Sequence, residues 1–577
     1  MTPLAACTIV SANYLSFARV LARSFRRHQP DGRFVVLLVD RVDGRFDPAD
    51  EPFEVIEIEA LADRVPNLRQ FLFQYTLLEA NTAIKPFFLE HLFETLGVDK
   101  LVYFDPDIWI LGSLEALSSQ LERASVVLTP HLDAPISDGA YPGEQAILQS
   151  GTYNLGFVGL RGDAVGRALL RWWQERLWDR CVVRIDQGLF VDQKWMDLVP
   201  GLFENVEVLR DPGYNVAYWN LHGRAVDVSA GHDANGVLQA VVARRGSDEP
   251  PSPLVFFHFS GIQPDSLEGV SKHQDRFTLA QIGDAAALYR HYRDRLIEEG
   301  FRDHRGWGYA FGKFSNGIAV PDAARALYLE ADAARRHRFG DPFEAEGDRS
   351  FFAWMNAPVG GGMSRLLVHL AQLRPDLRAT FADPAGADAA AYAVWLRDMG
   401  PAHLKIDRRL LDGLVEAPEA PTTVVGLGKR IARRAFKSPP AQLAKAAVKK
   451  ALGPERFRAL KRRLKPPPPA DPVAGPAVDP SLPDVERVGL NVVGYLRAET
   501  GMGEAGRSMV QAAEAADLPV SPHALELGVV ARQAEAAYAD ATSDFSFDIN
   551  LLVVNADQVE PVCAHLGEDV VGGRYNV

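Results

Sequence analysis

Cysteine is scarce in this sequence of 577 residues, which contains only Cys7, Cys181 and Cys563. Three widely spaced cysteines argue for a reducing compartment and against disulfides or a cysteine-based zinc site. No run of about 18 apolar residues occurs, so no membrane-spanning helix is expected. The N-terminal residues lack a basic leader, and we expect a first strand and helix there rather than a signal peptide. These absences favour a globular, cytoplasmic protein.

Charge is unevenly distributed along the chain. The formal net charge is −13, but residues 429–465 hold fourteen Lys and Arg against one acid, Glu455, a local net charge of +13. The remainder therefore carries −26, which disfavours nucleic acid as a partner of the whole chain. The basic segment could form amphipathic helices that bind an anionic membrane surface. One alternative is a solvated helical linker. The other is nucleic-acid binding, which the small number of aromatic residues in the segment disfavours.

Residues 1–300 alternate short apolar runs with segments of helical periodicity. The runs "TIVSA", "FVVLLVD" and "LVYFDPDIWIL" are typical of buried parallel strands. This alternation predicts an α/β, Rossmann-like domain with a mostly parallel sheet, in which ligands collect at the carboxyl ends of the strands.

The rest of the chain divides into four predicted parts. Residues 301–425 are rich in Ala, Leu and Arg at helical spacing and are expected to be mainly helical. Residues 426–465 contain the basic segment, and residues 466–486 are a Pro-rich, extended linker. Residues 487–577 begin a second, incomplete Rossmann-like unit.

Two carboxylates follow one predicted buried strand. In "KLVYFDPDIWIL", Asp105 and Asp107 are one residue apart where the strand ends. Burying either one unpaired would be costly, so the pair needs a cation or water. An Asp-X-Asp pair at a strand end offers hard oxygen ligands that suit Mn²⁺ or Mg²⁺. The alternative is a surface turn, ended by Pro106, in which both acids are solvated.

Several motifs in order give residues 5–275 a resemblance to the retaining GT-A glycosyltransferases of the galactosyltransferase and glycogenin type. "VYFDPDIWIL" resembles the metal-binding Asp-X-Asp strand, and "VFFHFSGIQP" the segment whose histidine completes the metal site, which implies Asp105, Asp107 and His258 as ligands. "IDQGLFVDQKW" resembles the Asp-Gln segment beside the reacting carbon, which implies Asp186 and Gln187 as catalytic residues. The resemblance further implies these donor-binding residues: Ser11, Asn13, Tyr14, Lys85, Asp133, Asn154, Gly261 and Lys272.

This resemblance implies a metal-dependent transferase. A sugar would pass from a nucleotide-diphosphate donor, with UDP expected, to a glycan or lipid-linked acceptor with retention of configuration. The departing phosphate would accept the acceptor's proton, so no carboxylate nucleophile is required. The implied setting is bacterial surface polysaccharide synthesis, with the protein cytoplasmic or peripheral on the inner face of the cytoplasmic membrane.

Departures from the family pattern leave alternatives open. Ser11 and Ala12 stand where the family usually has acids, and Gln263 where it has lysine. Lys272 or His273 is expected to meet the diphosphate instead. One alternative is a degenerate, non-catalytic domain that serves as a scaffold for the C-terminal unit. A nucleotidyltransferase would also use paired acids, but "SANYLSFARV" lacks the Gly-rich basic loop that such an enzyme needs.

The C-terminal unit opens with a strand, a glycine-containing turn and a helix. Gly501, Gly503 and Gly506 would let backbone amides approach a ligand at the helix N-terminus, or would serve tight packing only. The segment resembles the opening of GT-B glycosyltransferases of the "group 1" kind. Because the donor-binding half of that fold is missing, we assign no catalysis to residues 487–577 and expect the full-length protein to be a fusion of two glycosyltransferases.

Overall fold

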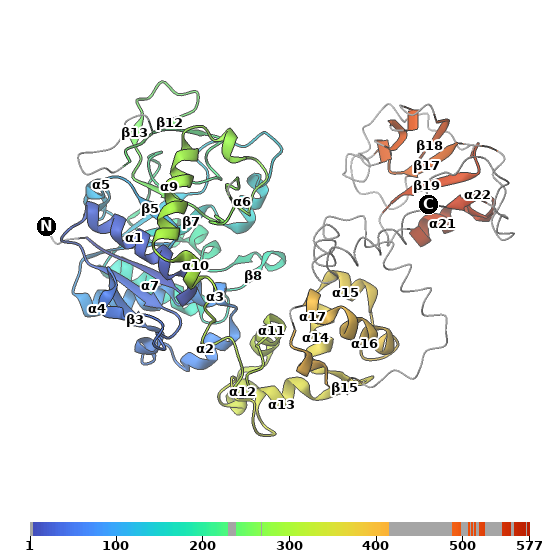
Figure 1. The fold of residues 1–577 in the computed structure, drawn as a ribbon, viewed down its shortest axis with the longest axis horizontal. Helices are drawn as coiled ribbons and strands as arrows, with labels where there is room; N and C mark the ends of the chain where they lie inside the picture. Colours follow the sequence, from blue (N-terminus) through green and yellow to red (C-terminus); the bar gives the residue numbers. More distant parts are fainter. Residues whose placement is uncertain are drawn as a thin grey trace. The chain divides into compact units, whose positions relative to one another are not determined.

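The computed structural model divides into two compact units, Met1–Thr422 and Thr423–Val577 (Figure 1). The residues it describes in the first unit are 4–228, 238–266, 268–404, 406–412 and 414. Those it describes in the second are 487, 489–497, 506–507, 509–511, 513–514, 518–525, 545–554, 559–572 and 574–576. The basic segment 429–465, the Pro-rich linker and the turn glycines Gly501 and Gly503 lie outside the described residues.

A seven-stranded sheet forms the centre of the first unit. In spatial order its strands are β10 (Val206–Val208), β6 (Val126–Pro130), β7 (Tyr153–Arg161), β4 (Lys100–Phe104), β1 (Ala5–Val10), β2 (Phe34–Leu38) and β3 (Glu54–Glu57). Only β7 runs antiparallel to its neighbours, β4 and β6. The prediction of an α/β fold with a mostly parallel sheet is therefore confirmed.

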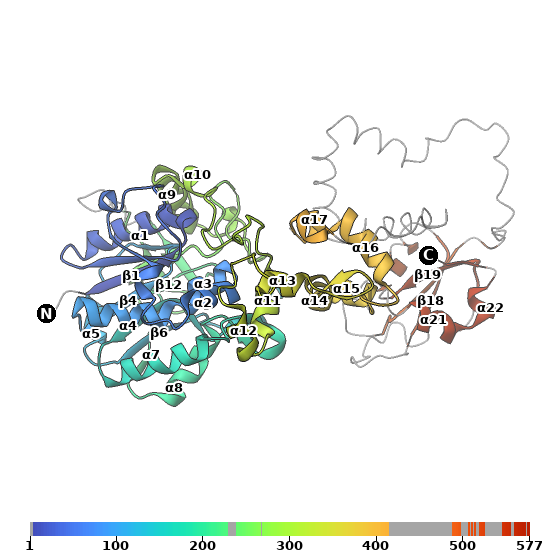
Figure 2. The same ribbon diagram turned by 90° about the horizontal axis from the view of Figure 1, so that it is seen from below.

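The central strands are buried on both faces, as their continuous apolar sequences predict. Every residue of β1, β2 and β4 is buried. Alternate residues of β1 face opposite cores, with Cys7 and Ile9 in one and Ala6 and Val10 in the other. Figure 2 shows α1 (Leu15–His28) on one side of the sheet and α4 (Lys85–Leu96) and α7 (Ala164–Leu177) on the other.

Because β1, β2 and β4 are parallel, the residues that follow them lie along one edge of the sheet. Ser11, Asp40 and Asp105 come after these strands. The antiparallel β7 begins at the same edge, which brings Asn154 there. The candidate site described below is built at this carboxyl edge.

The first unit also contains short strands and helices outside the central sheet. They are β5 (Ile108–Ile110) with β14 (Phe256–His258), the hairpin β8 (Val183–Arg184) with β9 (Leu189–Phe190), the sheet β11 (Arg224–Asp227), β12 (Val241–Arg244) and β13 (Ser252–Pro253), and the helices α2 (Leu68–Gln74), α3 (Leu77–Ala83), α5 (Glu115–Gln120), α6 (Glu144–Ser150), α8 (Val199–Leu202), α9 (Ala285–Glu298) and α10 (Phe301–His304).

Helices from residue 322 onward extend one of the two cores beyond the sheet. They are α11 (Asp322–Glu330), α12 (Ala333–Phe339), α13 (Phe351–Asn356), α14 (Arg365–Leu373), α15 (Pro375–Thr380), α16 (Ala389–Asp398) and α17 (Gly400–His403). Buried Arg325 on α11 donates to the backbone carbonyls of Leu72, Phe73, Tyr75 and Phe311 at 2.7–3.1 Å. These bonds fix α11 against the end of α2, so both regions share one hydrophobic core.

The second unit contains a four-stranded parallel sheet. Its order is β18 (Val520–Ala524), β17 (Leu490–Gly494), β19 (Ile549–Val553) and β20 (Tyr575–Asn576), with α21 (Val559–Leu566) and α22 (Glu568–Val571). The five-part domain division and the GT-B resemblance stay predictions. Among the described residues, no helix combines the length and the apolar character needed to cross a bilayer.

Candidate metal centre and active site

Asp105 and Asp107 occupy the turn between β4 and β5. The Asp105 amide donates to the carbonyl of Gly156 (2.7 Å), and the amide of Ile108 donates back to the Asp105 carbonyl (3.1 Å). These bonds end the buried strand and turn both carboxylates toward the sheet edge. The Tyr103 hydroxyl donates to Asp105 Oδ1 at 2.7 Å. A side chain of β4 therefore orients the Asp105 carboxylate.

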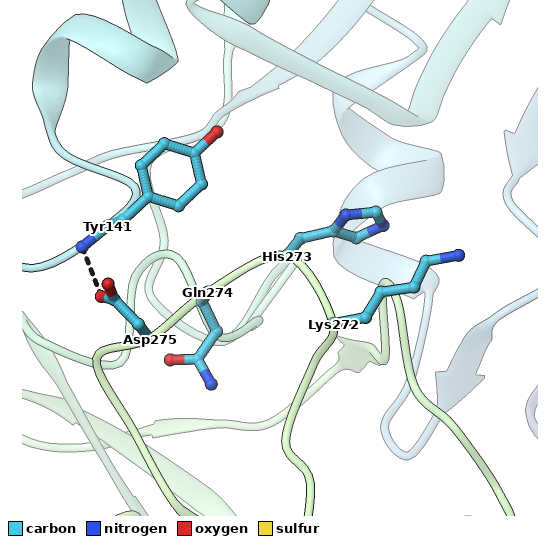
Figure 3. A pocket seen from close by; sticks show the side chains of 5 residues that line it. All are labelled: Tyr141, Lys272, His273, Gln274 and Asp275. Carbon is cyan, nitrogen blue, oxygen red and sulfur yellow. Dashed lines mark hydrogen bonds between the residues drawn. The ribbon is translucent and has the colours of Figure 1, made fainter. Parts of the chain in front are cut away.

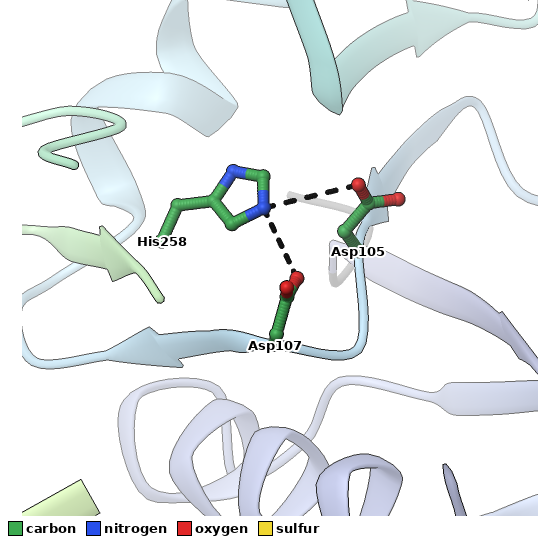
Figure 4. Close-up of side chains that lie close together, drawn as sticks. All are labelled: Asp105, Asp107 and His258. Atoms are coloured by element: carbon green, nitrogen blue, oxygen red, sulfur yellow. Dashed lines mark ion pairs between the residues drawn. The ribbon is translucent and has the colours of Figure 1, made fainter. Parts of the chain in front are cut away.

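His258 reaches the acidic turn through strand pairing. β14 runs antiparallel to β5 with His258 opposite Ile108, and the Phe259 amide donates to the Asp107 carbonyl at 2.9 Å. His258 Nε2 lies 3.0 Å from Asp107 Oδ1 and 3.9 Å from Asp105 Oδ2 (Figure 4). One ligand atom from each of the three residues lies within 4.8 Å of the others. Two carboxylates and one imidazole form a donor set that fits a divalent cation.

The charges and burial around the trio shift the pKa values of its members. Burial raises the pKa of Asp105 above its usual range, although Lys85 and His258 oppose the shift. Burial lowers the pKa of His258, but the Asp107 and Asp105 carboxylates outweigh it, so the net pKa is raised. The two carboxylates therefore favour a positive charge beside them.

Two asparagines orient the histidine ring. His258 Nδ1 lies 3.2 Å from Asn154 Oδ1 and 3.3 Å from Asn215 Oδ1. The Gly156 amide also donates to Asn154 Oδ1 (3.2 Å), which identifies that atom as the amide oxygen. Nδ1 therefore carries a proton and donates it, which leaves Nε2 free to face the acids as a ligand.

Gly156 leaves the space that the imidazole occupies. A Cβ at this position would lie 2.2 Å from His258 Cε1 and 2.8 Å from Asn154 Oδ1. Any side chain here would displace the ring or its orienting amide. The glycine of "NLGF" is thus a steric requirement for this position of the His258 ring.

A cavity of about 550 Å³ opens beside the trio. That volume suits a small-molecule ligand. Its polar lining residues include Lys85, Asp105, His131, Asn154, Asp192, Gln193, His258 and His273. Burial, followed by the nearby His258, lowers the pKa of His131 to about 3, so this ring is neutral and Nε2 can accept from Asn154 Nδ2 at 3.1 Å.

Lys85 is engaged within the protein. Its ammonium lies 2.6 Å from Asp192 Oδ2, donates to the Leu155 carbonyl (3.0 Å) and sits 4.0 Å from the centre of the Tyr103 ring. Both side chains of the pair are at most 2% exposed. Burial raises the pKa of Asp192, with Lys85 opposing the shift. Lys85 thus balances a buried carboxylate at the cavity wall.

Gln193 lines the cavity next to Asp192. Its Oε1 accepts from the Leu155 amide at 3.0 Å and from Asn154 Nδ2 at 3.4 Å, and its Nε2 donates to the Ser150 carbonyl at 2.9 Å. These bonds fix the amide plane at the wall of the cavity.

The structure does not bring Asp186 and Gln187 to this cavity. Both lie at the exposed tip of the β8–β9 hairpin, where the Asp186 carboxylate is 67% exposed and pairs with Arg184 at 3.1 Å. The same hairpin contributes the side chains of Val183, Ile185 and Phe190 to the cavity lining. Its polar tip therefore points away while its apolar residues face inward.

Asp133 also lies outside the cavity lining. Its carboxylate is buried against Arg224 (3.0 Å), whose guanidinium donates to the carbonyls of Pro212 and Tyr214. Arg244 lies 3.9 Å away. This network holds the chain after β6 against the β11–β12 sheet.

Ser11, Asn13 and Tyr14 lie together after β1. The Ser11 hydroxyl donates to Asn13 Oδ1 at 2.6 Å, and Tyr14 is 40% exposed and stacks on Phe17 with centroids 4.7 Å apart. Burial and then Asp107 and Asp105 raise the pKa of Tyr14, which places its hydroxyl in the field of the metal centre.

Gly261 and Lys272 lie in the loop that follows β14. The Lys272 amide donates to the Gly261 carbonyl (3.1 Å), and a Cβ on Gly261 (φ +72°) would lie 2.4 Å from the ring of His273. Lys272 and His273 line a neighbouring cavity of about 340 Å³ with Tyr141, Gln274 and Asp275 (Figure 3). Tyr141 and His273 border both cavities, so the Lys272 side chain stands beside the main one.

Four site residues were missed from the sequence: Asn215, His131, Asp192 and Gln193. The signal for the last two was present, because "IDQGLFVDQKW" contains the Asp-Gln pair twice. Nothing comparable singled out the other two.

Comparisons with known proteins give distant likenesses. No protein-family model matches the chain. The uncharacterized proteins YfnF and YfnD of Bacillus subtilis (strain 168) are 26% and 25% identical over 303 and 260 residues, which cover 51% and 44% of this chain and 92% and 76% of theirs.

Similar solved structures include three transferases. The galactosyltransferase LgtC, in complex with donor and acceptor sugar analogs, is 14% identical, and the match covers 51% of this chain and 95% of LgtC with a TM-score of 0.28. The glycosyltransferase GlyE of Streptococcus pneumoniae TIGR4 is 14% identical, and the match covers 54% of this chain and 67% of GlyE with a TM-score of 0.30. Mouse xyloside xylosyltransferase 1 is 14% identical, and the match covers 44% of this chain and 97% of that enzyme with a TM-score of 0.27. At TM-scores this low, the likenesses support no conclusion about activity.

Replacing Lys85 with methionine should leave the Asp192 carboxylate buried and unpaired. We expect the free energy of unfolding of the first unit to fall by about 3–5 kcal/mol at neutral pH. The folded-state pKa of Asp192 is already raised by burial and would rise further. The folded state then binds more protons than the unfolded state. The loss in free energy of unfolding relative to wild type should therefore become smaller as the pH falls from about 7 to about 5.

Denaturant titrations at both pH values measure this effect. The double variant K85M/D192N removes the stranded charge and should recover part of the loss at neutral pH. An equal loss at both pH values, with no recovery in the double variant, would contradict the ion-pair interpretation.

Proposed function

We propose that this protein is a metal-dependent glycosyltransferase that uses a nucleotide-diphosphate sugar as donor. The observation that carries the proposal is the cluster of Asp105, Asp107 and His258 beside a cavity at the carboxyl edge of a mostly parallel sheet. A divalent ion held there, Mn²⁺ or Mg²⁺, would act as a Lewis acid toward the donor's diphosphate.

The charge balance around the cavity supports a bound cation. Asp105, Asp107 and Asp192 contribute three carboxylates, whereas Lys85 contributes one fixed positive charge that is already paired. A diphosphate would be repelled by this arrangement unless positive charge were added. Lys272, on the loop beside the cavity, is placed to supply more of it.

The second Asp-Gln pair is the better candidate for the sugar-binding wall. Gln193 lines the cavity with its amide held on both sides, whereas Gln187 is exposed on the hairpin. A neutral amide cannot act as a carboxylate nucleophile, and the Asp192 carboxylate is occupied by Lys85. We therefore assign Gln193 to positioning the donor sugar, in a reaction that retains anomeric configuration without a protein nucleophile.

The rim of the cavity favours an acceptor with an apolar part. Leu78, Tyr141, Val183 and Ile185 all line the cavity, yet they are 60%, 58%, 44% and 38% exposed. Several large apolar side chains exposed around one cavity mark a binding surface. We infer an acceptor sugar carried on a lipid or another apolar group. UDP as the nucleotide, a polysaccharide product and membrane contact through 429–465 belong to the same proposal.

Metal dependence can be tested without the acceptor. Purified protein should hydrolyse a nucleotide-sugar slowly with Mn²⁺, and chelation should abolish the reaction. Because Asp105 supplies a ligand oxygen, D105N should lower the rate at least about 100-fold and weaken Mn²⁺ binding. The matched control D376N removes an exposed acid on α15. Turnover by D105N or by chelated protein at the wild-type rate would overturn the proposal.

The two Asp-Gln pairs make a matched comparison. Q193A should lower kcat about 100-fold, because loosening the sugar-binding wall misplaces the donor. Q187A should leave kcat and KM unchanged. Steady-state hydrolysis measures kcat and KM for both variants. A large loss of kcat in Q187A with none in Q193A would assign donor positioning to Gln187 on the hairpin instead.

Acceptor preference tests the apolar rim. Wild type should transfer to octyl glycosides with a lower acceptor KM than to methyl glycosides of the same sugar. V183S/I185S should remove that preference and leave donor hydrolysis unchanged, while L373S, on the surface of α14, should change neither. Equal KM values for both glycosides in wild type would exclude the apolar acceptor, and NMR of the product reads its anomeric configuration.

A further inference from the structure

Figure 1 shows the helices that follow residue 322, and a further cavity, of about 690 Å³, lies among them. α12, α13, α14 and the segment before α13 form its walls. It shares no lining residue with the cavity at the metal centre. The lining residues are Arg335, Arg338, Phe339, Asp348, Arg349, Trp354 and Arg365. Four arginines therefore face one acid.

Trp354 holds two of these arginines in place. The guanidinium carbon of Arg365 lies 4.5 Å from the ring centroid, and that of Arg335 lies 5.5 Å away. Arg365 also donates to the Trp354 carbonyl at 2.6 Å. The ring itself packs against Phe339 and Phe351 with centroids 5.3 and 5.8 Å apart. Stacking thus fixes two cations near each other on a rigid aromatic base.

The positive charge here is not balanced. Arg335 has Asp332 at 3.6 Å, but in the described part of the chain no carboxylate oxygen lies within 4.0 Å of the guanidinium nitrogens of Arg338, Arg349 or Arg365. Arg365 is also the first residue of α14, where the positive end of the helix dipole disfavours a cation. Burial, followed by Arg335, lowers the pKa of Arg365. The fold therefore keeps together cations that repel one another.

We propose that this Arg–Trp cluster, Arg335, Arg338, Arg349 and Arg365 around Trp354, binds a phosphate-bearing ligand with at least two negative charges. Guanidinium groups match phosphate oxygens with paired N–H donors, and such bonds are stronger than neutral ones. The ligand's charge would relieve the repulsion among the arginines. The volume accommodates a diphosphate with part of the group that carries it. A soluble diphosphate and a phosphate-bearing lipid headgroup share this chemistry.

Calorimetric titration of the full chain with inorganic pyrophosphate tests the site. The titration is run in chelator, so that the metal centre cannot contribute. Wild type should bind, and R335Q/R365Q should bind at least about tenfold more weakly, since two charge-assisted contacts are lost. The control R374Q, which removes an exposed arginine paired with Asp376 in the same group of helices, should bind as wild type does.

Sedimentation with vesicles separates the two sources of phosphate. Vesicles of phosphatidylcholine, with and without phosphatidic acid, are compared for wild type and R335Q/R365Q, which both keep residues 429–465. If R335Q/R365Q loses pyrophosphate binding but keeps vesicle binding, the ligand is a soluble one. If the variant loses vesicle binding but keeps pyrophosphate binding, the ligand is a lipid headgroup. No difference between wild type and variant in either arm overturns the proposal.

A second variant covers the case in which R335Q/R365Q does not fold. R338Q/R349Q alters the two arginines that make no ring contact with Trp354, and it should weaken binding in the same arm. Metal-dependent hydrolysis should persist in both variants. A failed cluster and a failed transferase assignment are therefore distinguishable.

Discussion

The pairing of β5 with β14 is the constraint on which the candidate active site depends. It joins segments about 150 residues apart and sets the imidazole of His258 opposite the turn that carries Asp105 and Asp107. A shift of one residue in this register would turn the histidine to the other face of its strand, away from the acids. The backbone, rather than any side-chain contact, therefore fixes which residues can share a cation.

Behind this pairing lies a layer of neutral amides. Asn154, Asn215 and Gln193 are nearly fully buried and bond to one another, to the backbone or to His258. Such bonds fix the tautomer and direction of the ring while adding no charge to that of the acids and Lys85. Gly156 completes the layer by leaving the ring its space.

The fold and the acid pair could be predicted because their signals are local, whereas His258 was implied only by the resemblance of its segment to a family motif. Continuous apolar runs identify buried strands, and a carboxylate pair at a strand end indicates a cation site. Local signals could not decide which of the two Asp-Gln pairs lies at the cavity, since both pairs in "IDQGLFVDQKW" have the same composition. What separates them is that Lys85 neutralises Asp192, a contact across more than 100 residues. The partner of Asp133 is also distant in sequence, because Arg224 follows 91 residues later.

The cavity beside Asp105 and the cavity around Trp354 have opposite electrostatic character. Beside the first cavity, the charge of Lys85 is neutralised by Asp192. Asp105 and Asp107 therefore repel any anion that arrives without a cation. Among the later helices, arginines face a single acid, which leaves a surplus of positive charge around Trp354. Under the two proposals, an anion would need an added metal at the cavity beside Asp105 and none at the cavity around Trp354. Phosphate groups would then be bound at two places by different means, and chelation would affect only one of them.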